Sequence, residues 1–144
     1  MSVFLLDVNV LIALAWPSHV AHTPVHRWFT KHAQQGWATC PIIECGFVRI
    51  ISNAAFSTDA LTPRDALALL GVNLSHPAHQ FWRDDLTLHQ ALATAGRHIT
   101  GHRQITDMYL LGLARHHKGR LATLDQAFGS LSGSRGSDVE LISS

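Results

Sequence analysis

Few cysteines, few charges and no long apolar run characterise this chain of 144 residues. Its two cysteines, Cys40 and Cys45, do not form a C-x-x-C pair, so they are interpreted as reduced thiols rather than as a redox motif or a zinc site. No apolar run approaches the roughly 20 residues that a membrane-spanning helix needs, and the first residues lack the basic segment of a secretory signal. We therefore expect a cytoplasmic protein with no membrane partner.

The composition is typical of a folded enzyme-sized domain. Hydrophobic residues make up 47% of the chain and charged residues 15%, which is ample for a core. No internal repeat and no linker interrupts the sequence. We expect one domain spanning residues 1–144.

Four of the ten acidic residues lie beside or within apolar segments. They are Asp7, Glu44, Asp107 and Asp125. An isolated buried carboxylate is costly or becomes protonated, so each needs a partner. A divalent metal ion shared by all four is the most economical partner.

The net charge of +1 hides an uneven distribution. Without those four acids, 10 − 4 = 6 acidic residues remain against 11 Lys and Arg. An acidic pocket in a basic surface is suited to a polyanionic substrate held near metal ions. An ordinary mixed surface explains the charge equally well.

Short apolar runs alternate with segments that carry helix signals. We expect strands over 3–6, 37–40, 79–82, 121–124 and 139–142, and helices over 8–15, 24–35, 41–52, 63–74, 86–95 and 105–117. Thr23 and Thr62, each followed by proline, are predicted N-caps; Gly96 and Gly119 are predicted helix stops, and 129–137 is a predicted loop. This alternation predicts a three-layer α/β/α domain with a central, mainly parallel sheet.

The predicted fold brings the four acids to one place. Asp7 and Asp125 directly follow strands, and ligands bind beyond the carboxyl ends of strands in open α/β sheets. Glu44 and Asp107 lie near the starts of helices, and each heads an apolar stripe at i+3, i+4 and i+7 that points it toward the sheet. A favourable interaction with the helix dipole explains one such acid, but not four at one edge.

Four carboxylates without a ligating cysteine favour a hard cation, Mg²⁺ or Mn²⁺. Such a cation lowers the pKa of a bound water and stabilises charge on phosphoryl oxygens. The chemistry predicted from the residues is phosphodiester hydrolysis.

The acidic segments also resemble the ordered motifs of PIN-domain nucleases. The matching segments are Leu5-Leu6-Asp7-Val8-Asn9-Val10-Leu11-Ile12, Cys40-Pro41-Ile42-Ile43-Glu44, Gln104-Ile105-Thr106-Asp107-Met108-Tyr109-Leu110 and Leu121-Ala122-Thr123-Leu124-Asp125. Within that superfamily, the length and the segments 16–19 and 36–39 resemble VapC toxins.

This resemblance implies a Mg²⁺-dependent endoribonuclease, with Mn²⁺ as a possible substitute, that acts on RNA, is inhibited by a cognate VapB antitoxin and forms a homodimer. It assigns catalysis and metal binding to Asp7, Glu44, Asp107 and Asp125. By the same resemblance, Asn9, Thr106 and Thr123 orient these carboxylates.

Basic residues offer candidate contacts to RNA phosphates, with a solvated basic surface as the alternative. The candidates are Arg49, Arg97, Arg103, Arg115, Lys118 and Arg120. Arg103 is favoured because it lies just before Asp107. No RNA-recognition module is present, so the groove around the site must select the RNA.

Eleven histidines raise the possibility of zinc. His19, His22 and His26 have i, i+3, i+7 spacing, but Pro24 interrupts any single helix through them, and the adjacent pair His116 and His117 lies on different helix faces. We therefore expect solvated or locally hydrogen-bonded histidines. Asp84 and Asp85 are predicted to form a polar turn.

Two other functions remain open from sequence. An aspartyl-phosphate phosphatase also places an aspartate after its first strand, but it needs a second aspartate two residues later, where this chain has Asn9. A dimeric RNA-binding module without turnover is the non-enzymatic alternative.

Overall fold

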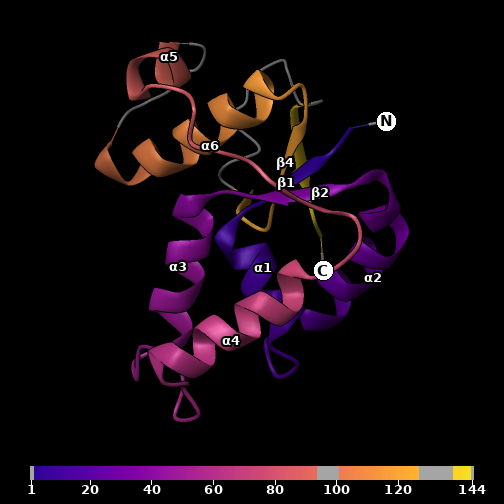
Figure 1. Ribbon diagram of the computed structural model, residues 1–144, viewed down its shortest axis with the longest axis vertical. Helices are drawn as coiled ribbons and strands as arrows, with labels where there is room; N and C mark the ends of the chain where they lie inside the picture. Colours follow the sequence, from indigo (N-terminus) through magenta and orange to yellow (C-terminus); the bar gives the residue numbers. More distant parts are fainter. Residues whose placement is uncertain (1, 94–100, 127–137, 144) are drawn as a thin grey trace.

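A parallel five-stranded sheet forms the centre of the molecule (Figure 1). The computed structural model describes residues 2–93, 101–126 and 138–143. The strands are β1 (Phe4–Leu6), β2 (Trp37–Thr39), β3 (His79–Phe81), β4 (Arg120–Thr123) and β5 (Val139–Leu141). Their order across the sheet is β3-β2-β1-β4-β5, and each neighbouring pair is parallel.

Helices cover both faces of this sheet, which confirms the predicted α/β fold. The helices are α1 (Val8–Ala15), α2 (His22–His32), α3 (Pro41–Ile51), α4 (Pro63–Leu74), α5 (Leu88–Ala93) and α6 (Ile105–His116), with 3₁₀ turns η1 (Ala33–Gln35) and η3 (His102–Gln104). In Figure 1, α5 and α6 lie on one side of the sheet and α1 to α4 on the other. None of the helices in the described residues is both long and apolar enough to cross a membrane.

The helix starts follow local chemistry. Asp7 caps α1, and the Thr62 hydroxyl accepts the Asp65 backbone N–H at 3.1 Å to cap α4 as predicted. Helix α5 begins later than expected because Thr87 and Gln90 form a reciprocal capping box, with contacts of 3.0 and 3.1 Å. Its predicted stop at Gly96 and the loop over 129–137 lie outside the described residues.

The predicted start of α2 is wrong. Val25 donates its backbone N–H to the carbonyl of Ala21 at 3.1 Å, so Thr23 lies inside the helix and does not cap it. The preceding turn, in which His22 bonds to the carbonyl of His19, begins the helix earlier than the Thr-Pro signal indicated.

The end of α6 also differs from expectation. Lys118, with φ 58°, adopts the left-handed conformation that closes the helix, while Gly119 and Lys118 donate to the carbonyls of Ala114 and Arg115 in a Schellman motif. Gly119 is needed for another reason: a Cβ there would lie 2.6 Å from the Val3 carbonyl and 2.7 Å from Trp82.

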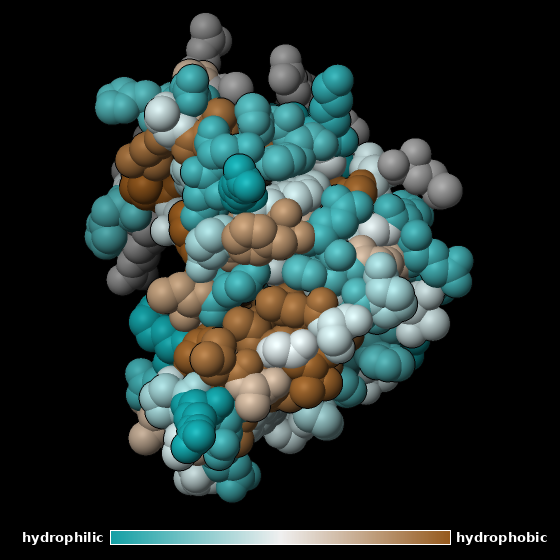
Figure 2. Space-filling view, viewed as in Figure 1, coloured by the Kyte–Doolittle hydropathy of each residue, from teal (hydrophilic) through white to brown (hydrophobic). Residues whose placement is uncertain are grey.

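Hydrophobic side chains gather on the surface of one helix as well as in the core. Figure 2 shows a hydrophobic area over α4, and Leu67 and Val72 of this helix are 61% and 70% exposed. The core itself contains fully buried residues from β1, α1, α3 and α6. The apolar face formed by these residues of α4 is more exposed than Ile42 of α3 and Leu88 of α5, which are 38% and 49% exposed.

The contact between α5 and α6 predicts a difference between two glycine substitutions. A Cβ at Gly112 in α6 would lie 2.6 Å from the Ala91 carbonyl, whereas nothing lies within 4 Å of one at Gly71 in α4. We expect Gly112→Ala to lower the free energy of unfolding by about 2 kcal/mol and Gly71→Ala to raise it by about 0.5 kcal/mol. Urea denaturation measures both, and equal effects would contradict the close packing.

Candidate active site

The strand order creates a crevice at the carboxyl edge of the sheet. Strands β1 and β4 are neighbours, with Leu6 opposite Ala122, and the helices that follow β1 lie on the face opposite to α6. The point at which the direction of winding reverses is where open α/β sheets bind ligands.

Asp7 is held rigidly at this point. Its backbone N–H donates to the Ala122 carbonyl at 2.9 Å, which continues the β1–β4 pairing. One carboxylate oxygen accepts the Val8 N–H at 2.8 Å, and the other accepts the Thr123 hydroxyl at 2.9 Å. The residue is only 5% exposed, so both hydrogen bonds lie in a protected environment.

Thr123 connects two of the acids. Its hydroxyl, which is fully buried, donates to Asp7 and accepts the backbone N–H of Asp125 at 3.1 Å. Asp125 is itself exposed at the end of β4. A single threonine thus orients the carboxylate of Asp7 and holds the backbone at Asp125, after two adjacent strands.

Asp107 completes a group of three interacting acids. It lies in the first turn of α6, and burial raises its pKa to about 6, assisted by repulsion from Asp7 and Asp125. Burial also raises the pKa of Asp7, assisted by Asp125 and opposed by the hydrogen bonds from Thr123 and Val8. The fold therefore forces three carboxylates into mutual repulsion.

Glu44 has a different partner, at the end of β2. It lies in the first turn of α3, and its carboxylate accepts the Thr39 hydroxyl at 2.8 Å. His79 Nε2 lies 2.8 Å from the same hydroxyl oxygen. Since the Thr39 proton points to Glu44, His79 is the donor to Thr39, and burial lowers the pKa of His79.

The carboxylates form an open site rather than a closed cage. Among the residues that the structure describes, no three of the four acids have oxygen atoms within 4.8 Å of one another. A hard cation such as Mg²⁺ normally keeps several waters and uses few protein ligands. The all-oxygen donor set fits such an ion.

Two of the predicted orienting residues are exposed. Asn9 lies on α1 and, with Asp125, borders a hollow of about 440 Å³ that His19 and Leu124 also line. Thr106 lies in the first turn of α6, and no hydrogen bond joins it to an acid within the described part of the chain.

The predicted phosphate contacts are dispersed. Arg49 is exposed on α3, whereas Arg115 and Arg120 form ion pairs with Asp138 and Glu140 at 2.9 and 3.0 Å. Arg97 and the side chain of Arg103 lie outside the described residues.

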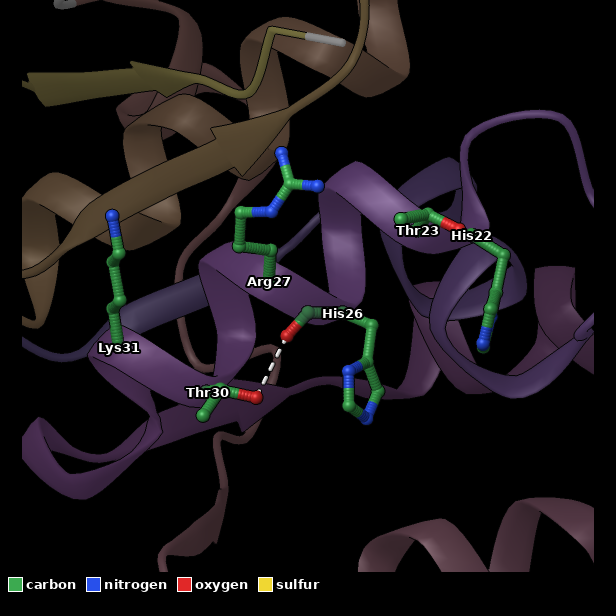
Figure 3. Close-up of a pocket in the computed structure, with 6 residues that line it drawn as sticks. All are labelled: His22, Thr23, His26, Arg27, Thr30 and Lys31. Carbon is green, nitrogen blue, oxygen red and sulfur yellow. Dashed lines mark hydrogen bonds between the residues drawn. The ribbon is translucent and has the colours of Figure 1, made fainter.

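A separate open pocket lies on α2, and none of the described residues that line it is a carboxylate (Figure 3). Arg27 and Lys31 extend on one side of the helix, His22 and His26 on the other, and the Thr30 hydroxyl donates to the His26 carbonyl at 2.9 Å. The His22 ring is hydrogen-bonded to Ala13, at 2.8 Å, as expected for a locally satisfied histidine.

Sequence reasoning missed Thr39 and His79. Thr39 is a fully buried polar residue at the end of β2, the same position that Thr123 occupies in β4. A hydroxyl at the end of a buried strand was therefore an available signal. No sequence signal indicated His79, because only the pairing of β2 with β3 brings it to Thr39.

Comparison with known families identifies the family of the chain. The family model of the PIN domain matches residues 4–133. The chain therefore belongs to the PIN-domain family.

Individual relatives of the chain identify a narrower group within this family. The chain is 47% identical to the protein named ribonuclease VapC39 of Mycobacterium tuberculosis over 85% of this chain and 88% of the relative. It is 42% identical to ribonuclease VapC38 of the same organism over 91% of each chain. These similarities confirm the predicted resemblance to VapC proteins.

A solved structure shares the fold at much lower identity. VapBC2 from Rickettsia felis, bound to a DNA fragment from its promoter, superposes with a TM-score of 0.69 at 11% identity, covering 98% of this chain and 99% of the other.

The raised pKa of Asp107 predicts an unusual dependence of stability on pH. The folded protein keeps this proton up to about pH 6, whereas the unfolded chain releases it near 3.8, so stability falls as the pH rises through that window. Asp107→Asn should therefore stabilise the metal-free protein at neutral pH by about 1 kcal/mol, reduced for solvent screening. Urea denaturation in EDTA at pH values on both sides of the window measures this, and a destabilised variant at neutral pH would contradict it.

The hydrogen bond from Thr123 predicts a change at Asp7. Thr123→Val removes the donor with little change in shape, so the pKa of Asp7 should rise further, whereas Thr123→Ser should preserve it. Carboxyl ¹³C NMR titration measures the pKa of Asp7. An unchanged value in the valine variant would show that the hydrogen bond does not orient this acid.

Proposed function

We propose that this protein is an endoribonuclease toxin of a VapBC-type pair that hydrolyses RNA phosphodiester bonds with Mg²⁺, for which Mn²⁺ can substitute. The observation that carries the proposal is the mutual repulsion of Asp7, Asp107 and Asp125 at the switch-point crevice. A cluster of carboxylates without a compensating cation is unfavourable near neutral pH, so the arrangement calls for a positive charge.

The carboxylates of Asp7, Glu44, Asp107 and Asp125 would hold the ion. Oxygen donors select Mg²⁺ or Mn²⁺ over softer metals, and such an ion, held by few protein ligands, keeps its other positions for waters and a phosphate oxygen. When bound, the ion supplies a water of lowered pKa and neutralises charge on the phosphoryl oxygens.

The chain's own residues supply the positioning. Thr123 and the Val8 N–H fix both oxygens of Asp7, and Thr39 orients Glu44 from the neighbouring strand. Because both hydroxyls belong to buried strand ends, the carboxylates are arranged before a substrate arrives. Asn9 and Thr106, exposed at the same edge, are proposed to orient the carboxylates through water.

The substrate class rests on the relatives, whose names identify them as ribonucleases. The hollow beside Asp125 and Asn9 offers a place for a nucleotide next to the scissile phosphate. Arg49, Arg97 and Arg103 remain proposed phosphate contacts, and Arg115 would have to exchange its partner Asp138 for a phosphate.

A VapB-type antitoxin and a second copy of this chain are the proposed partners. The structural neighbour is a VapBC complex, and the exposed apolar face of α4 is typical of a protein–protein contact. Sedimentation velocity of the isolated protein tests the homodimer.

RNA cleavage tests the proposed activity. The protein should cleave structured RNA only with Mg²⁺ or Mn²⁺, and Asp107→Asn should lower the rate at least about 100-fold because it removes a metal-binding charge. Asp59→Asn, which changes an exposed acid outside the site, is the matched control and should retain full activity.

Two outcomes would contradict the proposal. Cleavage by Asp107→Asn at the rate of the control would exclude the acidic site. RNA binding without cleavage under every divalent metal would favour the alternative, a dimeric RNA-binding module without turnover.

A further inference from the structure

A second group of potential metal ligands lies at the opposite end of α6. Asp85, in the segment between β3 and α5, faces His116 and His117 at the C-terminal end of the helix. Asp85 Oδ1 lies 3.8 Å from His116 Nε2 and 3.5 Å from His117 Nε2, and the three atoms lie within 4.8 Å of one another. Within the described residues, they form the only group of three such donors at this spacing.

Both distances lie within the range of an ion pair but are longer than a direct hydrogen bond. A hydrogen bond from an imidazole to a carboxylate is roughly 2.7–3.2 Å long, and both nitrogens stand farther away than that. Ligands about 2.0–2.1 Å from a tetrahedral Zn²⁺ are roughly 3.3 Å apart. The observed separations of 3.5 and 3.8 Å are close to this value.

One ligand is positioned by the fold and has no other partner. The ring of His117 stacks on Trp82 with centroids 4.3 Å apart and planes at 12°. The left-handed Lys118 and the close approach of Gly119 to Trp82 hold this turn in place. Buried Nε2 of His117 makes no hydrogen bond with any described residue, which is unfavourable unless a ligand satisfies it.

We propose that Asp85, His116 and His117 bind a Zn²⁺ ion, with water as the fourth ligand. Two imidazoles and one carboxylate are a donor set that Zn²⁺ accepts and Mg²⁺ disfavours. The site is distinct from the acidic one, since Asp107 and His116 are nine residues apart on α6, or roughly 13 Å along its axis.

The ion would fasten the segment after β3 to the end of α6. The neighbouring residue Asp84 lies close to Cys40 and to the Ile42 backbone at the start of α3, and the Leu86 carbonyl accepts the Tyr109 hydroxyl at 2.9 Å. The segment therefore already bridges α3 and α6. Zn²⁺ would add a third attachment.

Calorimetric titration with Zn²⁺ in excess Mg²⁺ tests the site. The wild-type protein should bind about one Zn²⁺ per chain, and His116→Gln and Asp85→Asn should each weaken binding at least about tenfold. Both residues are exposed, so neither substitution should impair folding. Two controls should bind as the wild type does: Asp107→Asn, in the acidic site, and His26→Gln, which removes one ring of the His22–His26 pair whose centroids are 5.7 Å apart.

Imidazole ¹⁵N NMR should show Zn²⁺ ligated to Nε2 of His116 and His117, and Zn²⁺ should raise the thermal unfolding midpoint of the wild type but not of Asp85→Asn. The proposal is overturned if no saturable binding occurs, if His116→Gln binds as tightly as the wild type, or if Asp107→Asn abolishes binding. Failure of this test would leave RNA cleavage by the acidic site unaffected.

Discussion

The pairing of β1 with β4 is the constraint on which the candidate active site depends. It extends beyond the strands through the hydrogen bond from the Asp7 N–H to the Ala122 carbonyl and through the Thr123 hydroxyl. The connections next to these two strands lie on opposite faces of the sheet (Figure 1). No helix of the described residues therefore covers the carboxyl ends of both strands, and a crevice lies between them. Asp7 and Asp125 enter that crevice as a direct result of the pairing.

The same pairing makes the metal-free site electrostatically unfavourable. Asp107 joins the crevice from the start of α6, and burial together with two neighbouring charges raises its pKa to about 6. Hydrophobic residues in the core must offset this cost, since the three acids contribute repulsion. In a metal-dependent enzyme, the acidic site is expected to destabilise the metal-free protein and to be stabilised when a cation binds.

Much of the fold was predictable because its signals are local. All five strands overlap the segments predicted as strands, although β3 is not an apolar run, and Thr62 and Pro63 marked the start of α4. The start of α2 could not be predicted, since a turn around His19 and Ala21 begins the helix before the Thr-Pro signal. The four acids could be placed at one edge from their positions after strands and at helix starts.

Contacts between distant segments could not be predicted. Nothing near Glu44 in sequence reveals that His79 contacts its partner Thr39 across the β2–β3 pair. His117 was placed on a different helix face from His116, but it is the residue after the helix, and the turn that follows points both rings toward one carboxylate. Tertiary pairing, rather than local pattern, determines these groups.

Paramagnetic broadening by Mn²⁺ tests the central claim, that one cation is shared by the acids of the crevice. Titration of the ¹⁵N-labelled protein should broaden the amide signals of Asp7, Asp107 and Asp125 first and together, and excess Mg²⁺ should restore them. The broadening should be lost in Asp107→Asn. Broadening centred elsewhere in the molecule, or an effect on Asp7 that the Asp107→Asn variant retains in full, would contradict a shared metal site.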